Sequence, residues 1–224
     1  IEIRKPYQLA SAMLYIQSHD RAVADADRIK NVQSAVKVLT DNPDRIGNPS
    51  GRNYVLGQVY VKWFQDGGQK PSLRARRGDL GFSENPDGAF SLPDALDEAF
   101  GIVERGKPAC ADSTARYRNA VFSRLLNAGI NYYNAKSYDS AIVYANHALK
   151  VNARSPQVGL AYQVISNASQ ATGDLTGAIA SLQAAIAKMG VDTASAASRA
   201  TATFNLAILT RDQQLLARQS VTQP

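Results

Sequence analysis

Residues 129–156 decide the fold, and they read GINYYNAKSYDSAIVYANHALKVNARSP. Apolar and small residues recur at helical spacing on both sides of the polar turn 134–137, which predicts two helices joined by a short connection. Pro156 ends the second helix, because proline lacks the N–H group that a helix interior needs. The stretch therefore predicts an antiparallel helical hairpin.

Small residues recur in this hairpin at a fixed spacing. The separation between Gly129 in the first helix and Ala141 in the second is the same as that between Ser166 and Ala178. Small side chains at these positions let two helices approach closely, where a large side chain would hold them apart. A generic antiparallel bundle, the alternative, gives no reason for this spacing. The pattern therefore indicates a hairpin that is repeated along the chain.

This pattern resembles the tetratricopeptide repeat, in which a small-x-x-Tyr helix precedes an Ala-x-x-x-Ala-x-x-Ala helix. The residues that carry the resemblance are Gly129, Tyr132, Ala141, Ala145, Ala148 and Pro156. It is specific over 118–189 and weaker elsewhere. The resemblance implies an all-α protein, a right-handed superhelical solenoid of about four hairpins plus a C-terminal helix.

The repeats predict a single domain over residues 1–224. The separation of Gly57 from Ala95 exceeds the spacing inside the other hairpins by the length of the Gly-, Pro- and Arg-rich stretch 66–91. We therefore expect one hairpin to contain an insertion. The expected parts are a degenerate repeat (7–42), the repeat with the insertion (52–106), two further repeats (113–152 and 157–189) and a terminal helix (193–219).

Composition sets the broad class of protein. The chain has 224 residues, of which 45% are hydrophobic, and its net charge is +6. No stretch approaches the ~20 apolar residues of a membrane span, so we expect none. Cys110 is the single cysteine, which excludes an intrachain disulfide and a cysteine-based metal site.

The residues that could carry catalysis are few. His19 and His147 are the only histidines, and neither has a carboxylate or a second histidine three or four positions away. We expect both to be ordinary surface or interface side chains and Cys110 to be a buried structural or incidental thiol. No nucleophile, phosphate-loop or dinucleotide motif is present. The sequence therefore predicts no enzyme, no cofactor and no metal.

Two sets of residues are candidates for binding. If the resemblance holds, the first helices line a concave groove, and the matching positions are Tyr54, Gln58, Lys62, Tyr133, Asn134, Gln163, Asn167, Gln170 and Arg211. The insertion supplies Lys70, Arg74, Arg76 and Arg77. Carboxamides both donate and accept hydrogen bonds, so they suit a peptide backbone, whereas arginines suit carboxylates, phosphates or sulfates. The alternatives are a polar solvent-facing surface and a solvated loop folded back over the helices.

We expect the chain to be a non-enzymatic scaffold that holds a peptide or protein partner in this groove. One alternative is a structural subunit that assembles with copies of itself, because the last repeat lacks a second helix. Another is polyanion binding through the insertion; we do not expect nucleic acid. Ile1 in place of an initiator methionine, together with the similarity to exported repeat proteins, predicts a periplasmic or secreted location.

Overall fold

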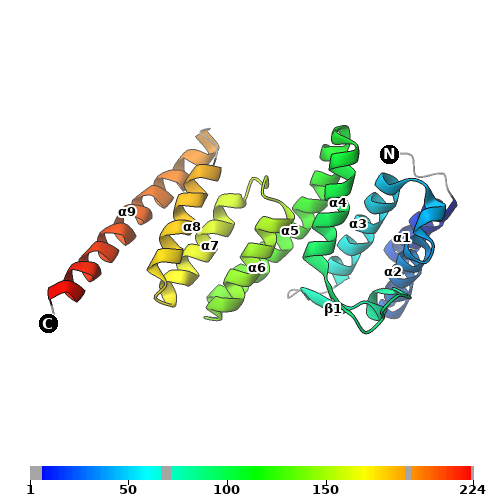
Figure 1. The fold of residues 1–224 in the computed structure, drawn as a ribbon, viewed down its shortest axis with the longest axis horizontal. Helices are drawn as coiled ribbons and strands as arrows, with labels where there is room; N and C mark the ends of the chain where they lie inside the picture. The colour runs from blue at the N-terminus through cyan, green and yellow to red at the C-terminus, as the bar shows by residue number, and fades with distance from the viewer. Residues whose placement is uncertain (1–6, 67–71, 190–192, 223–224) are drawn as a thin grey trace. The chain divides into compact units, whose positions relative to one another are not determined.

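A computed structural model describes residues 7–66, 72–189 and 193–222 of the chain (Figure 1). The helices of this part are α1 Tyr7–Arg21, α2 Asp25–Thr40, α3 Pro49–Asp66, α4 Leu92–Gly106, α5 Ala111–Asn134, α6 Tyr138–Val151, α7 Val158–Ala171, α8 Leu175–Lys188 and α9 Thr193–Thr222. The short elements are the 3₁₀ turns η1 Pro43–Ile46, η2 Gly78–Leu80 and η3 Pro108–Cys110, and the strands β1 Arg74–Arg76 and β2 Ala89–Ser91. Helices predominate and neighbouring helices pack on one another, which confirms the all-α class.

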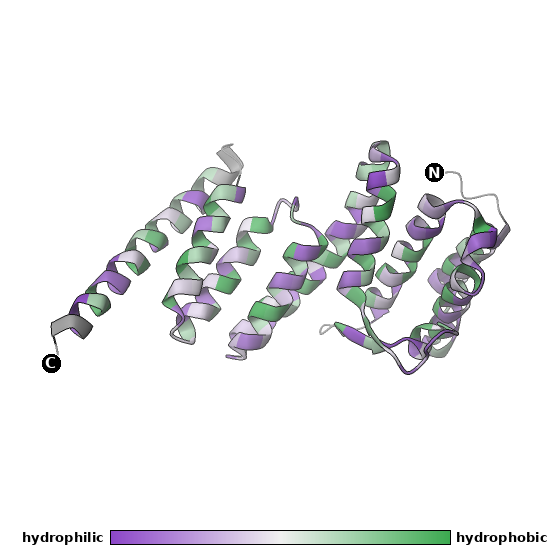
Figure 2. Cartoon of the chain, viewed as in Figure 1, coloured by the Kyte–Doolittle hydropathy of each residue, from purple (hydrophilic) through white to green (hydrophobic). Residues whose placement is uncertain are grey.

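The chain divides into two compact units, Ile1–Val121 (unit 1) and Phe122–Pro224 (unit 2), and the boundary falls within α5. Hydrophobic and hydrophilic residues are intermixed along the helices (Figure 2). This mixture is expected of helices that bury one side. The single domain over 1–224 and the right-handed superhelix stay predictions.

In unit 1, α2 packs on α1 and α3, and α4 packs on α3. Gly57 of α3 lies directly against Phe100 of α4, because a Cβ atom added to Gly57 would lie 2.3 Å from the Phe100 ring. Phe100 is fully buried, so it has no room to withdraw. The sequence pattern pairs Gly57 with Ala95. In the structure, the Phe100 ring occupies the space beside Gly57 that a side chain would fill.

The insertion between α3 and α4 contains more regular structure than its sequence suggests. Strand β1 pairs antiparallel with β2, with Ala75 opposite Phe90. Gly81 adopts φ +95°, and an added Cβ would lie 2.4 Å from the backbone oxygen of Gln33, so only glycine fits here. The Gln33 side chain donates a hydrogen bond to the backbone oxygen of Asp79, 3.1 Å away. The described part of the insertion therefore folds back over α2.

In unit 2, the close helix approach predicted from small residues is confirmed. An added Cβ at Gly129 of α5 would lie 3.3 Å from the Ala141 oxygen and 3.4 Å from the Ala145 nitrogen, both backbone atoms of α6. Backbone atoms of a packed helix move little, so a larger residue at 129 would push the two helices apart.

The rest of unit 2 continues from helix to helix. Helix α7 packs on α6 and α8, and α9 packs on α8 and more lightly on α7. The Asp174 carboxylate accepts a hydrogen bond from the Gly177 N–H at 2.8 Å and so caps the start of α8. The core between α8 and α9 is built from Ala178, Leu182, Ala202 and Leu209. This core fixes α9 beside α7, where the candidate site lies.

Candidate functional site

A pocket of about 200 Å³ lies in unit 2 where α7 and α9 meet over α8. It is lined by Ser166, Asn167 and Gln170 of α7, Leu182 of α8, and Asn205, Ile208 and Leu209 of α9. Residues three or four apart on a helix share a face, which explains why α7 and α9 each contribute such a set. Two predicted groove residues, Asn167 and Gln170, therefore lie in one pocket.

The polar side chains of this pocket have hydrogen-bonding groups to offer. Asn167 and Gln170 are exposed, Asn205 is partly exposed, and Ser166 is 2% exposed. None of these four side chains is hydrogen-bonded to another residue in 7–66, 72–189 or 193–222. Each carboxamide has two N–H donors and one oxygen that accepts, which matches the alternating donors and acceptors of an extended backbone.

The pocket floor is apolar. Leu182 and Leu209 are 1% and 3% exposed and belong to the core between α8 and α9, so they cannot move away. Ile208 adds a partly buried aliphatic side chain at the edge. The lining thus combines carboxamides, a hydroxyl and fixed aliphatic groups, which offers hydrogen bonds and apolar contact to a ligand.

The other groove residues predicted in unit 2 lie outside the pocket lining. Gln163 is partly exposed on α7, one turn before Asn167. The Tyr133 ring packs on Tyr138, with centroids 5.7 Å apart, and Asn134 is exposed at the end of α5. Arg211 is paired with the neighbouring Asp212 at 2.9 Å.

The groove residues predicted in unit 1 are held by internal contacts. Tyr117 donates a hydrogen bond to Gln58 Oε1 at 3.0 Å, and its ring meets Tyr54 edge-on at 6.0 Å. Gln58 is only 6% exposed. Burial, with Tyr117 close by, raises the pKa of Tyr54. These side chains tie α3 to the first part of α5.

The arginines of the insertion are also largely engaged. Arg76 forms an ion pair with Asp79 at 3.1 Å. The Arg77 guanidinium lies 4.3 Å from the centroid of the Phe82 ring. Its Nε donates a hydrogen bond to the backbone oxygen of Glu84. Arg74 is exposed, and Lys70 lies outside the described residues. Two of the three described arginines, Arg76 and Arg77, therefore have partners within the insertion.

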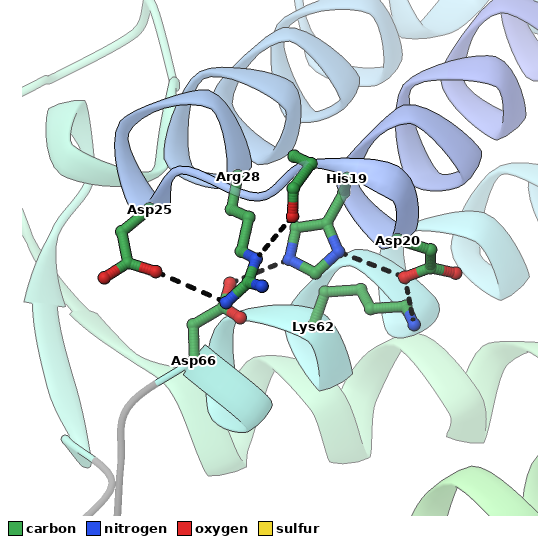
Figure 3. Close-up of polar contacts among 7 residues, drawn as sticks. His19, Asp20, Asp25, Arg28, Lys62 and Asp66 are labelled. Atoms are coloured by element: carbon green, nitrogen blue, oxygen red, sulfur yellow. Dashed lines mark hydrogen bonds and ion pairs between the residues drawn. The ribbon is translucent and has the colours of Figure 1, made fainter.

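A polar cluster in unit 1 was missed by the sequence analysis (Figure 3). His19 of α1 is 6% exposed, and its two ring nitrogens lie 2.8 Å from Asp66 Oδ2 and 3.1 Å from Asp20 Oδ1. Lys62 reaches the same Asp20 oxygen at 2.6 Å, so the predicted groove residue Lys62 is an ion-pair partner here. Asp66 lies 47 residues beyond His19, too far for any local motif to signal the contact.

Charge within this cluster acts on Asp20. Partial burial works to raise its pKa, but hydrogen bonds from Lys62 and His19, together with their positive charge, outweigh burial and lower the pKa below its usual value. The cluster thereby ties the end of α1 to α3. Beside it, Arg28 bonds to the Ala22 oxygen and to Asp25 (Figure 3).

Metal-binding groups and membrane-spanning helices are both missing from the described ranges. These residues contain no group of three or more His, Cys, Asp or Glu side chains placed to hold a metal ion. None of their helices combines the length and apolar character needed to cross a membrane. Cys110 is a free thiol in η3 and is partly exposed, so the expectation of a buried thiol is wrong; the short η3 turn buries none of its residues.

Comparison of the chain with protein-family models, curated proteins and solved structures gave no match.

Proposed function

We propose that the chain is a non-enzymatic scaffold of tetratricopeptide-like hairpins, stacked as a right-handed solenoid, and that the α7–α9 pocket holds an extended peptide segment of a protein partner. The observation that supports this most is the convergence of Ser166, Asn167, Gln170 and Asn205 on one pocket while their side chains stay unbonded to described residues. The oxygen of Gln58 in unit 1, by contrast, accepts a hydrogen bond from Tyr117.

The chemistry of the pocket suits a backbone ligand of broad sequence. A carboxamide can bond to both the N–H and the C=O of one peptide group, so it binds a strand without reading its side chains. The floor of Leu182 and Leu209 then accommodates one aliphatic or aromatic side chain of the segment. We expect a single apolar anchor residue in the peptides that bind.

Peptide selection tests the proposal. Random peptides displayed on phage are selected on the full chain, and the enriched sequences are synthesised and titrated by fluorescence anisotropy. Each lost hydrogen bond weakens binding by about 0.5–1.5 kcal/mol, so the Asn167→Ala/Gln170→Ala/Asn205→Ala variant should bind at least about tenfold more weakly. The Gln163→Ala/Asn167→Ala/Gln170→Ala variant tests the groove as predicted from sequence.

A matched control uses carboxamides of the same unit outside the pocket. Asn127 of α5 and Gln183 of α8 are both exposed, so Asn127→Ala/Gln183→Ala should leave peptide affinity unchanged. Unchanged affinity in the pocket variant, or an equal loss in the control, would contradict the proposal.

Self-assembly is a second candidate, favoured by the apolar residues that α9 leaves exposed. Phe204, Leu215 and Leu216 are 67%, 48% and 55% exposed. Phe204 and Leu215 are separated by close to a whole number of helical turns, so both project from one side of the helix. Sedimentation across a hundredfold concentration range tests this candidate: assembly should weaken in Phe204→Ser/Leu215→Ser, and a monomer at all concentrations would exclude it.

Polyanion binding through the insertion has less support, because Arg76 and Arg77 have partners within the insertion. It would require heparin affinity that falls steeply with added salt.

A further inference from the structure

A second pocket, of about 220 Å³, lies within unit 1 beneath the insertion. Helix α3 contributes Leu56 and Tyr60, α4 contributes Ala99 and Ile102, and the insertion contributes Phe82 and Phe90. The volume is below the roughly 300–1,000 Å³ of sites for drug-sized ligands, so the pocket suits a small group.

The aromatic wall of this pocket is held in place. The Phe90 ring lies 5.4 Å from the Tyr60 ring and 5.1 Å from the Phe82 ring, measured between centroids. Phe82 follows Gly81, whose close contact with the Gln33 backbone fixes the insertion on α2. A wall that is already ordered loses little conformational freedom when a ligand binds.

Tyr60 is an unusual member of this wall. It is 5% exposed, yet its hydroxyl makes no hydrogen bond to any residue in the described ranges. The hydroxyl oxygen is not one of the enclosed side-chain atoms that lack a partner, so it is open to solvent and available to a ligand in the pocket. Burial also raises the pKa of Tyr60, so the hydroxyl keeps its proton and remains a donor.

Positive charge exceeds negative charge around this hydroxyl. Among the residues that the structure describes, Arg52, Arg77 and the exposed Glu98 are the charged groups close enough to act on Tyr60. Arg52 lines the pocket, and its Nε donates to the Leu39 oxygen at 2.7 Å, which holds the guanidinium in position. Its two terminal nitrogens carry no bond to a described residue and so remain free to donate. A guanidinium whose terminal nitrogens are both free is suited to a carboxylate.

We propose that this pocket binds a carboxylate attached to a compact apolar group, with Arg52 and the Tyr60 hydroxyl donating to the carboxylate and Phe82 and Phe90 packing on the apolar part. Two sources carry this chemistry: a free small acid and the C-terminal residue of a polypeptide. The site is separate from the α7–α9 pocket and does not depend on the function proposed for it. It gives the insertion a role as the wall of a binding site.

Isothermal titration of the full chain tests the proposal with three probes. N-acetyl-L-phenylalanine presents the carboxylate, its amide removes the charge, and an acetylated tetrapeptide ending in phenylalanine represents a chain terminus. Hydrogen bonds to a charged group are stronger than those to a neutral one, so the acid should bind at least about tenfold more tightly than the amide. Tighter binding of the tetrapeptide than of the free acid would identify a C-terminus as the source, and the reverse would identify a small acid.

Two variants separate the pocket from the fold. Tyr60→Phe keeps the ring and removes only the unbonded hydroxyl, so the chain should fold normally and lose at least about fivefold in affinity for the acid. Tyr15→Phe is the matched control, because Tyr15 lies on α1 outside this pocket lining and its hydroxyl too is bonded to no described residue, so affinity should stay unchanged. Glu98→Gln should strengthen binding of the acid, because it removes a negative charge at the pocket.

Three results would overturn the proposal. They are no binding of either acid at millimolar concentration, equal affinity for acid and amide, and full affinity in a folded Tyr60→Phe variant. Circular dichroism of each variant verifies the fold in the same samples.

Discussion

Similar polar side chains are bonded to neighbouring helices in unit 1 and are not bonded in the same way in unit 2. In unit 1, Gln58 bonds to Tyr117 and Lys62 pairs with Asp20, so predicted groove residues join helices. In unit 2, Asn167 and Gln170, which the same sequence pattern predicted as groove residues, are bonded to no described residue. The pattern therefore predicts which helix carries a residue, but neighbouring helices decide whether its polar group is free to bind a ligand.

The largest expected effect concerns Arg118 in unit 1. It is 8% exposed and bonds to Asp97 at 2.7 Å and Glu104 at 2.8 Å. Arg118→Met leaves two carboxylates without their cation, so the free energy of unfolding should fall by about 3 kcal/mol. Urea unfolding followed by fluorescence measures it, because Trp63 of α3 is the only tryptophan and reports on unit 1.

The neighbouring Arg116 is the control. It is exposed and packs over Tyr117, so Arg116→Met should lower stability by less than about 1 kcal/mol. Equal losses of unfolding free energy in the two variants would mean that the bonds of Arg118 to Asp97 and Glu104 stabilise unit 1 no more than an exposed arginine does.

The second effect concerns helix packing in unit 1. Gly57→Ala forces the buried Phe100 ring to move and should cost about 2 kcal/mol. Gly101→Ala in α4 meets only the end of the flexible Arg105 side chain, so alanine's better helix propensity should make it neutral or stabilising by up to about 1 kcal/mol. The same fluorescence assay compares the two; a neutral Gly57→Ala would argue against the tight α3–α4 contact.

The third effect is a pH dependence of the unfolding free energy of unit 1. The pKa of Asp20 is lowered in the folded chain, so its contribution is present above about pH 4 and is lost as the pH falls through the lowered value. Because the Asp20 side chain is 49% exposed, solvent screening limits the loss in Asp20→Asn at about pH 6 to about 0.5 kcal/mol. The difference between the variant and the wild type in the urea concentration of unfolding should therefore narrow as the pH is lowered below about 4.

A double-mutant cycle with Lys62→Met sharpens this prediction. Lys62 is the leading group that lowers the pKa of Asp20, so Asp20→Asn should have a smaller effect near neutral pH once Lys62 is removed. Full additivity of the two substitutions would show that the ion pair makes no contribution.

The smallest effect is expected in unit 2. The Asn167→Ala/Gln170→Ala/Asn205→Ala variant removes side chains that bond to no described residue, so its unfolding free energy should stay within about 0.5 kcal/mol per substitution. Far-UV circular dichroism follows the unfolding, because unit 2 lacks tryptophan. A loss above about 2 kcal/mol in total would place these side chains in the fold rather than in binding.

Local sequence patterns predicted the parts of the fold that depend on neighbours in the chain. The repeated spacing of small residues predicted the close approach of Gly129 to α6, and the long separation of Gly57 from Ala95 located the insertion between α3 and α4. Turn-rich composition did not predict the β1–β2 pairing, because its strands are too short for a clear alternation of apolar and polar residues.

Contacts between residues far apart in the sequence could not be predicted from local patterns. The His19–Asp66 contact joins residues 47 apart, and the Tyr60 pocket depends on phenylalanines of the insertion folding back over α3. For the candidate site, the sequence pattern predicted Asn167 and Gln170 on α7 but not Asn205, because from α9 only Arg211 was assigned to the groove and the α7–α9 contact joins residues far apart in the sequence.

The contact at Gly129 has a consequence for evolution. Backbone atoms of Ala141 and Ala145 fill the space that a side chain would need, so drift at this position is restricted even where the surface of the protein changes freely. Distant homologues should therefore keep a glycine or another small residue here, long after the remaining sequence has diverged beyond alignment.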